Sequence, residues 1–292
     1  MQDNAIPPVI GGLGTLAPRY DLILADVWGV VHNGVAAFPA ATDALARARA
    51  AGATVILVSN APRPGAVVER QIAGYGVPAG CFDAVVASGD VARDELARRP
   101  GVRVHHVGPT RDLPNYEGLD LRLVGLEEAE VAVCTGLVDD TKETPDDYRP
   151  LLGRMRARGL TMICANPDMV VERGDKLIWC AGALAKIYAD AGGEVHYAGK
   201  PHAPIYDLTF KRAAELRGEA VPRERALAIG DGLHTDLAGA AGQGIDCLFV
   251  AGGIHAADFG LAAGAAIDPA KLARVFADAH VRPIGIMPRL SW

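Results

Sequence analysis

The sequence predicts an α/β fold built on a mostly parallel sheet. Short apolar runs alternate along the chain with alanine-rich stretches of helical length. This alternation is typical of parallel strands that are joined by right-handed helical crossovers. Polar residues directly follow several of the apolar runs. They would therefore lie at the carboxyl ends of the strands, which is the edge of an open parallel sheet where such folds hold their ligands.

The expected strands are short runs rich in Val, Ile, Leu and Ala, most of them bounded by polar or glycine residues. In chain order they are Leu22–Ala25, Thr54–Val58, Ala84–Ala87, Val102–Val107, Val131–Cys134, Thr161–Cys164, Ala226–Ile229 and Cys247–Val250.

The expected helices lie between these runs, and local signals mark some of their ends. Gly52 and Gly159 stand where a helix would end before a strand, and Pro145 suits a first helical turn. In chain order the helices are Ala41–Ala51, Gly65–Tyr75, Val91–Arg98, Asp146–Arg158, Ala181–Ala191, Ile205–Arg217, Thr235–Gln243 and Pro269–Ala279.

The middle of the chain is expected to form a domain of its own. It contains several strand–helix units, whereas the sharpest polar clusters lie on both sides of it. We therefore predict an inserted α/β domain over 86–180, within a discontinuous core domain formed by 1–85 and 181–292.

Composition excludes several classes of function. The chain has 292 residues, a net charge of −6 and no run of Lys or Arg, so neither nucleic acid nor an anionic membrane is expected as a partner. No apolar run approaches the roughly 18 residues that span a bilayer, and the first residues lack a signal-peptide pattern. Five scattered cysteines without a CxxC pair indicate a reducing compartment, so we expect a cytoplasmic protein.

Two acidic clusters follow expected strands. Asp26 ends the first strand, where a carboxylate can attack phosphorus or bind Mg²⁺. Asp231 and Asp236 follow the strand 226–229 and open a helix. One carboxylate of the pair can bind a divalent cation directly, while the other supports the residues that bind it. The alternatives are a turn-capping Asp26 and an acidic helix start that the helix dipole already favours.

Four further candidate residues for binding an anion lie after a strand or just before a helix. Ser59 and Asn60 come directly after the strand 54–58, and Arg63 lies in the same loop. Lys200 stands between Gly and Pro just before a helix, where its ammonium can act as a point charge on phosphate. The alternatives are a plain helix cap at Ser59 and solvated side chains at Arg63 and Lys200. Together, the clusters suit phosphoryl transfer, which depends on positioning and charge neutralisation.

Four segments taken in order resemble the motifs of the haloacid dehalogenase (HAD) superfamily, in particular its NagD-like class with an α/β cap. The segments are Asp26-Val27-Trp28-Gly29-Val30, Val58-Ser59-Asn60, Gly199-Lys200-Pro201 and Gly230-Asp231-Gly232-Leu233-His234-Thr235-Asp236. The resemblance covers nearly the whole chain and implies a Rossmann-like parallel-sheet core with an inserted cap. It extends to a subgroup that carries Asp-x-Trp-Gly-Val in place of Asp-x-Asp-Gly.

The resemblance implies a Mg²⁺-dependent phosphatase that acts on a small phosphorylated metabolite. Asp26 would form an aspartyl-phosphate, while Ser59 and Lys200 would bind the phosphoryl group. Asp26, the backbone oxygen of Trp28 and Asp231 would bind Mg²⁺, with Asp236 supporting that site. Caps of this class often carry dimer contacts, so a homodimer is possible.

Cap segments similar to the turn around Asn166 and Asp168 face the substrate in this class, which makes both residues candidates for substrate binding. The alternative is plain turn chemistry, because Asn-Pro-Asp is a turn sequence by itself.

Trp28 stands where HAD phosphatases carry a second Asp as general acid and base. An indole N–H only donates and cannot serve as a base, so turnover is expected to be slow by about 10²–10⁴-fold. His32 is the expected substitute, and its alternative is a loop histidine that packs or faces solvent. The competing function is a phosphometabolite-binding protein that has lost efficient turnover.

Overall fold

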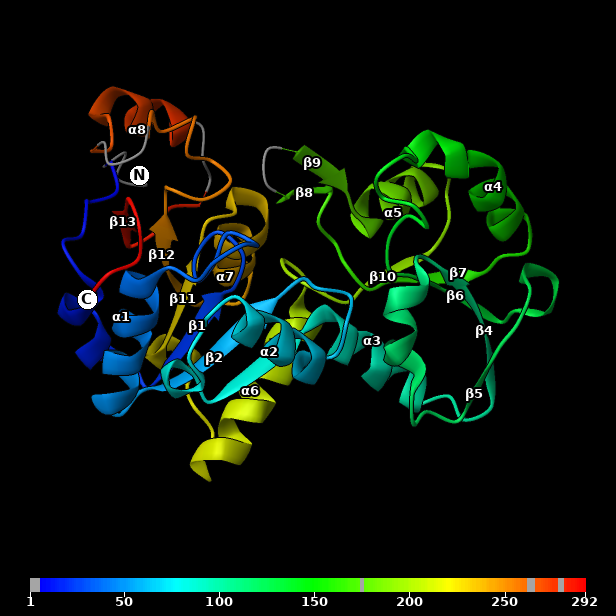
Figure 1. Cartoon of the computed structure of the whole chain (residues 1–292), viewed down its shortest axis with the longest axis horizontal. Coiled ribbons are helices and arrows are strands. Elements are labelled where there is room, and N and C mark those ends of the chain that lie inside the picture. The colour runs from blue at the N-terminus through cyan, green and yellow to red at the C-terminus, as the bar shows by residue number, and fades with distance from the viewer. Residues whose placement is uncertain (1–5, 174–175, 262–265, 278–280) are drawn as a thin grey trace. The chain divides into compact units, whose positions relative to one another are not determined.

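The computed structural model describes residues 6–173, 176–261, 266–277 and 281–292. The chain divides into two compact units, which are described separately. The first unit contains the chain up to Val58, Glu69–Val85 and Tyr206–Trp292, and the second contains Ser59–Val68 and Val86–Ile205. In Figure 1 most of the second unit is green, whereas the first combines the blue and the yellow-to-red parts of the chain.

The first sheet has six strands in the order β13-β12-β11-β1-β2-β3 (Figure 1). The pairings of β1 with β2 and β11, of β11 with β12 and of β12 with β13 are all parallel. The strands are β1 (Leu22–Asp26), β2 (Thr54–Ser59), β3 (Ala84–Ala87), β11 (Ala226–Gly230), β12 (Asp246–Val250) and β13 (Gly285–Met287).

The order of these strands creates a topological switch point beside β1. The chain passes from β1 to β2 on one side, whereas β11, which is much later in the sequence, pairs with β1 on the other side. The crevice at the carboxyl ends of two such strands is the usual ligand site of an open parallel sheet. The residues at the ends of β1 and β11 are therefore the first place to look for function.

The second sheet has five strands in the order β10-β7-β6-β4-β5, and all its pairings are parallel. An antiparallel hairpin, β8–β9, lies outside this sheet. The strands are β4 (Val102–Val107), β5 (Leu121–Leu123), β6 (Val131–Cys134), β7 (Thr161–Cys164), β8 (Val170–Arg173), β9 (Lys176–Trp179) and β10 (Val195–Tyr197).

Eight α-helices connect or cover the strands within the described residues. They are α1 (Pro39–Ala50), α2 (Gly65–Gly74), α3 (Ser88–Ala97), α4 (Arg149–Ala157), α5 (Ala181–Asp190), α6 (Ala203–Arg217), α7 (Ala238–Gly242) and α8 (Pro269–Val275). A π-helical turn, Leu233–Leu237, immediately precedes α7. The α/β class and the parallel sheets predicted from the sequence are confirmed.

The second unit extends beyond the boundary at residue 180 that the sequence suggested. Helix α5 begins at Ala181, and its buried side chains Leu184, Ala185 and Tyr188 belong to the same apolar cluster as Met162. The short strand β10 then pairs with β7 in the second sheet. Both elements therefore belong to the second unit, which ends at Ile205.

All eight expected strands are present, with bounds that agree within one residue. The expected helices are also present, but three differ in form. The helix expected over Asp146–Arg158 begins as a 3₁₀ turn, Pro145–Tyr148, which leads into α4. The helix expected over Thr235–Gln243 starts earlier, as the π-helical turn, and the last helix ends at Val275 instead of Ala279. The final two residues of that expectation, 278 and 279, lie outside the described residues.

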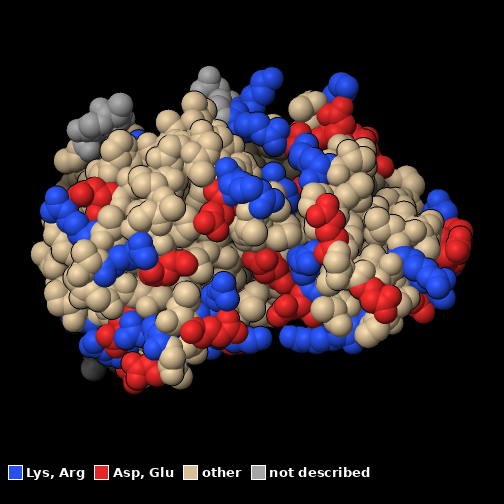
Figure 2. All heavy atoms as spheres, turned by 60° about the horizontal axis from the view of Figure 1, so that its bottom comes forward, with Lys and Arg blue, Asp and Glu red and all other residues tan. Residues whose placement is uncertain are grey.

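Charged side chains of both signs lie beside one another on the face drawn in Figure 2. On that face, among the described residues, neither sign covers a broad continuous area. The described residues of that face therefore form no basic stripe of the kind by which proteins commonly bind nucleic acid. Within the described residues, none of the helices combines the length and the apolar character that crossing a bilayer requires.

Candidate metal and phosphate site

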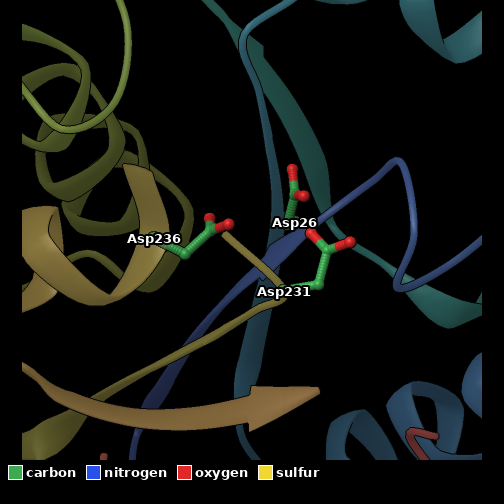
Figure 3. Close-up of side chains that lie close together, drawn as sticks. All are labelled: Asp26, Asp231 and Asp236. Carbon is green, nitrogen blue, oxygen red and sulfur yellow. The ribbon is translucent and has the colours of Figure 1, made fainter. Parts of the chain in front are cut away.

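Three carboxylates converge in the first unit, as Figure 3 shows. Asp26 is the last residue of β1, Asp231 directly follows β11, and Asp236 lies in the π-helical turn. One carboxylate oxygen from each residue lies within 4.8 Å of the other two. Asp231 and Asp236 are buried, and Asp26 is half-buried. The switch point between β1 and β11 thus gathers three acids that the sequence placed in separate segments.

Two glycines make room for the carboxylate of Asp231. A Cβ atom on Gly29 would lie 2.1 Å from Asp231 Oδ2, and one on Gly253 would lie 1.8 Å from the same oxygen. The backbone N–H of Ile254 donates a hydrogen bond of 2.8 Å to that oxygen. Gly29 also has a φ of +80°, which favours glycine. The carboxylate is therefore held in a cradle of backbone that tolerates no side chain at either glycine.

Asp236 is fixed by the turn that carries it. Its Oδ2 accepts a hydrogen bond of 3.0 Å from the backbone N–H of Gly232. A Cβ atom on Gly230 would lie 2.1 Å from Asp236 Cγ, so glycine is required at the end of β11 as well. π-Helical turns are rare and occur frequently at functional sites. Here the turn directs Asp236 back toward the end of β11.

The three carboxylates fit a hard divalent cation. Negative charges this close repel one another strongly when water is largely excluded, and a cation between them removes that cost. Carboxylate oxygens are the ligands that Mg²⁺ and Ca²⁺ prefer. The cradle around Asp231 fixes the ligand in advance, which is how surrounding groups support a metal site.

Trp28 packs within the loop that follows β1. Its ring lies edge-on to the ring of His32, with centroids 5.2 Å apart. A Cβ atom on Gly34 would lie 2.6 Å from two atoms of the indole ring, so that glycine is required by close contact as well as by its φ of +83°. The indole thus holds the loop together through His32 and Gly34.

His32 is buried and neutral at ordinary pH. Its side chain has only 2% of its surface exposed, and its ring also contacts Tyr75 at a centroid distance of 5.0 Å. Burial lowers the pKa of His32 to about 4. Nδ1 accepts a hydrogen bond of 2.8 Å from the N–H of Gly34. A base with so low a pKa is weak at pH 7, and the packing favours the structural alternative for His32.

His32 should make folding stability depend on pH. Because its pKa falls from 6.5 in the unfolded chain to about 4 in the folded protein, protonation favours unfolding. The contribution is fully present above pH 6.5 and is lost as the pH falls toward 4, by about 3 kcal/mol in total. Urea unfolding at pH 7.5, 6 and 5 should show a steeper loss of stability for wild type than for His32→Asn. Parallel pH curves for the two proteins would contradict this assignment.

In the second unit, Asn60 bonds to the backbone of Lys200. Asn60 Oδ1 accepts from the Lys200 N–H at 2.8 Å, and Asn60 Nδ2 donates to the Lys200 carbonyl at 3.1 Å. The same Nδ2 also donates to Asp168 Oδ1 at 2.9 Å. Asn60 and Lys200 are both buried, with exposed fractions of 5% and 4%. The carboxamide predicted to bind phosphate is thus engaged by protein groups.

The other residues expected to bind phosphate or substrate have local partners. Ser59 is half-buried at the end of β2, and its Oγ accepts from the N–H of Ala61 at 3.2 Å. Arg63 lies 3.6 Å from the buried carboxylate of Asp112. Neither contact matches the alternatives considered from the sequence: Ser59 bonds within its own turn and does not cap α2, which begins at Gly65, and Arg63 pairs with a buried carboxylate instead of facing solvent.

The Asn166–Asp168 segment forms the turn that its sequence indicates. Asn166 Oδ1 accepts a hydrogen bond of 3.1 Å from the N–H of Asp168. Asn166 is buried, and Asp168 is half-buried. The turn directs the Asp168 carboxylate toward Asn60.

The structure brings the predicted residues together in two groups. Asp26, Asp231 and Asp236 meet in the first unit, and Asn60, Asp168 and Lys200 meet in the second. Sequence reasoning missed the supporting glycines Gly29 and Gly253 and the N–H of Ile254. The pair Gly252-Gly253, which follows the strand 247–250 after a single alanine, was the available signal, since paired glycines there allow close approach of the backbone.

Comparisons with known protein families identify two matching segments. Residues 23–122 match the family of haloacid dehalogenase-like hydrolases. Residues 197–279 match a second family described as HAD-hydrolase-like. The two segments include Asp26, Ser59, Lys200, Asp231 and Asp236.

Solved structures share this fold. The crystal structure of a haloacid dehalogenase-like hydrolase from Brucella suis 1330 has 50% sequence identity and a TM-score of 0.85, covering 97% of this chain and 100% of that one. A glycerol phosphate phosphatase from Mycobacterium tuberculosis, solved in complex with calcium, has 24% identity and a TM-score of 0.64. It covers 93% of this chain and 72% of its own.

Two characterised relatives are phosphatases by name. D-glycerol 3-phosphate phosphatase of Mycobacterium tuberculosis is 30% identical over 251 residues, which is 83% of this chain and 66% of that protein. The chain thus spans just under two thirds of this relative's length. Ribonucleotide monophosphatase NagD of Escherichia coli K12 is 26% identical over 243 residues, which is 81% of this chain and 89% of that protein.

Proposed function

The chain belongs to the haloacid dehalogenase-like hydrolases, and from this premise we propose that it is a Mg²⁺-dependent phosphatase acting on a small organic phosphate. The observation that carries the proposal is the convergence of Asp26, Asp231 and Asp236 within 4.8 Å. The characterised relatives named above act on glycerol phosphate and ribonucleotide monophosphates by their names, which supports a small phosphoester as the substrate class. Residues 86–180 would serve as the inserted α/β cap.

Asp26 acts as the nucleophile in this proposal. Its carboxylate oxygen forms a bond to phosphorus while the bond from phosphorus to the ester oxygen breaks, and the departing alkoxide takes a proton from solvent water, which leaves an aspartyl-phosphate and the free alcohol. Water then attacks phosphorus and releases a proton to solvent while the bond from phosphorus to the Asp26 oxygen breaks, so inorganic phosphate leaves and the Asp26 carboxylate is restored. Ser59 donates a hydrogen bond to the phosphoryl group, and the Lys200 ammonium neutralises its charge. Asn60, Arg63, Asn166 and Asp168 remain further candidates for phosphate or substrate binding.

Asp26, Asp231 and the backbone oxygen of Trp28 would hold Mg²⁺, and Asp236 would support the site. When bound, Mg²⁺ would neutralise negative charge on the phosphoryl group and on the carboxylates. Because residue 28 contributes only a backbone oxygen, its indole side chain leaves this role intact. The calcium complex of the solved relative supports a site for a hard divalent cation in this fold.

Gly253→Ala should weaken Mg²⁺ binding by about 10- to 100-fold, the size typical of changes that disturb the support of a metal ligand. The added Cβ would lie 1.8 Å from Asp231 Oδ2 and would displace that carboxylate. Isothermal titration with Mg²⁺ measures the effect. Gly242→Ala in α7 is the matched control, since its Cβ meets nothing within 4 Å. Equal Mg²⁺ affinity in the two variants would show that the cradle does not support the cation.

Trp28 favours a second candidate function, a phosphometabolite-binding protein with little turnover. The indole cannot exchange a proton with the leaving oxygen or with water, and the buried His32 is a poor replacement for the missing carboxylate. Beryllium fluoride with Mg²⁺ separates the two functions. A beryllium fluoride adduct on Asp26 in a crystal structure supports chemistry at that carboxylate, and its absence, together with phosphate bound elsewhere, favours binding alone.

His32 remains the candidate for acid–base catalysis that the sequence offered. If it acts in that role, His32→Ala should change the pH–rate profile of phosphate release. If it only packs, the rate falls or the protein loses stability while the shape of the profile is unchanged. The burial and the low pKa of His32 support the second outcome.

A further inference from the structure

We propose that Asn60 is a positioning residue that sets the backbone of Lys200, and that Asp168 fixes the orientation of the Asn60 carboxamide. The proposal rests on the proposed function in one respect, since Lys200 is taken to bind the phosphoryl group. It assigns Asn60 a different role from the one suggested by its sequence position, because the carboxamide would act through Lys200 and would not touch phosphate.

The first argument is the pair of hydrogen bonds between Asn60 and Lys200. Oδ1 accepts from the Lys200 N–H at 2.8 Å, and Nδ2 donates to the Lys200 carbonyl at 3.1 Å. Two bonds of opposite sense to one residue fix both the position and the tilt of its backbone, as paired strands do. The Lys200 side chain therefore starts from a defined point.

The second argument is the orientation of the amide. An ionised carboxylate only accepts hydrogen bonds, so Asp168 requires the NH₂ group of Asn60 to face it. The 2.9 Å contact between Asn60 Nδ2 and Asp168 Oδ1 meets this requirement. Oδ1 is then left to face the Lys200 N–H. Both hydrogens of Nδ2 are used, one by Asp168 and one by the Lys200 carbonyl, so the side-chain amide retains no N–H for a phosphate oxygen.

The third argument is close packing around the Lys200 backbone. A Cβ atom on Gly199 would lie 2.0 Å from Ser88 Oγ, 2.4 Å from Asn60 Oδ1 and 2.8 Å from Pro167 Cδ. Lys200 itself is only 4% exposed. The segment therefore has little room to shift, and a change at Asn60 must be felt at Lys200.

Exchanging the carboxamide of Asn60 and the carboxylate of Asp168 tests the proposal. Asn60→Asp places two carboxylates in contact and removes the bond to the Lys200 carbonyl, so the affinity for inorganic phosphate and kcat/KM should both fall by about 10- to 100-fold. In the double variant Asn60→Asp/Asp168→Asn, the carboxamide at position 168 donates to the carboxylate at position 60, which reverses the direction of the original hydrogen bond. The carboxylate at position 60 still accepts from the Lys200 N–H. We expect the double variant to regain only part of the loss, severalfold, because the carboxylate at position 60 still cannot donate to the Lys200 carbonyl.

A direct phosphate contact by Asn60 gives a different result. Aspartate cannot donate to phosphate, so the double variant would then bind phosphate no better than Asn60→Asp, and this result would overturn the proposal.

Ser88→Ala is the neighbouring control, because Ser88 Oγ lies 3.5 Å from Asn60 Oδ1 and is not needed for the pair of bonds. Circular dichroism checks that each variant is folded. If Asn60→Asp does not fold, Asn60→Ser, Lys200→Ala and their double variant replace it. A double variant no worse than Lys200→Ala supports the proposal, and a loss equal to the sum of the two single losses contradicts it.

Titration with phosphate separates this proposal from the proposed function. A wild-type protein that binds phosphate, shows rescue in the double variant and releases no phosphate from esters would retain the role of Asn60 and contradict the phosphatase. A protein that hydrolyses esters without rescue would retain the phosphatase and contradict the role of Asn60.

Discussion

Asp26→Asn should lower kcat for phosphate release by on the order of 10⁴-fold or more, as removal of an enzyme nucleophile does. The amide oxygen of asparagine is a poor nucleophile and carries no charge, so it neither attacks phosphorus nor balances a cation. Initial rates of phosphate release with a small phosphoester and Mg²⁺ measure the effect. Mass spectrometry after rapid acid quench should find phosphate on Asp26 in wild type and none in the variant.

The same strand offers a matched control. Asp21 precedes β1 at the opposite end from Asp26 and pairs with Arg225 at 2.8 Å. Asp21→Asn removes one carboxylate from the same sheet but should leave kcat unchanged, with a loss of at most about 1 kcal/mol of stability because the pair is partly exposed. If Asp26→Asn keeps as much activity as Asp21→Asn, Asp26 is not the nucleophile.

Trp28→Asp should raise kcat for phosphate release by about 10²-fold or more, the typical contribution of a general acid and base. A carboxylate at this position can protonate the leaving oxygen and then accept a proton from water, whereas an indole cannot. The gain comes with lower thermal stability, because the loop loses the contacts of the indole with His32 and Gly34. Steady-state rates between pH 5 and pH 8 measure the effect.

Trp28→Asn separates chemistry from packing. Asparagine has nearly the size of aspartate and loses the same indole contacts, but it does not exchange a proton. We expect the rate to rise in the Asp variant only. An equal rise in both variants would mean that the indole limits the rate by obstructing the site, and no rise in either would mean that proton transfer does not limit turnover.

The convergence of Asp26 and Asp231 could be predicted from the sequence because of how parallel sheets are built. Asp26 and Asp231 each follow a recognisable apolar strand, and the carboxyl ends of parallel strands meet at one edge. The cradle of Gly29 and Gly253 could not be predicted in the same way. It depends on the path of three separate segments around one carboxylate, and a glycine in a sequence does not show which atom approaches it.

The elements that were not predicted are short or lack an apolar pattern. Strand β5 is a mostly exposed edge strand with Arg122 at its centre, and β9 exposes Leu177 and Trp179. Strand β10 has only three residues, none of them fully buried. So short a strand leaves no periodic signal in the sequence, and its pairing with β7 becomes visible only in the folded chain.

Asn60 shows the limit of reasoning from the position of a motif. Its place after Ser59 suggested phosphate binding, but its partners Asp168 and Lys200 lie 108 and 140 residues away in the sequence. Hydrogen bonds between residues so distant in sequence depend on the tertiary fold. The side-chain types alone allow a carboxamide to bind a phosphate or a backbone equally well.

The most direct test of the central claim is the release of inorganic phosphate from a panel of small phosphoesters, measured for wild type and Trp28→Asp with Mg²⁺ and with EDTA. We predict release by both proteins with Mg²⁺, faster in Trp28→Asp, and loss of release with EDTA. No phosphate release by either protein in the presence of Mg²⁺ would contradict the assignment of this chain as a phosphatase.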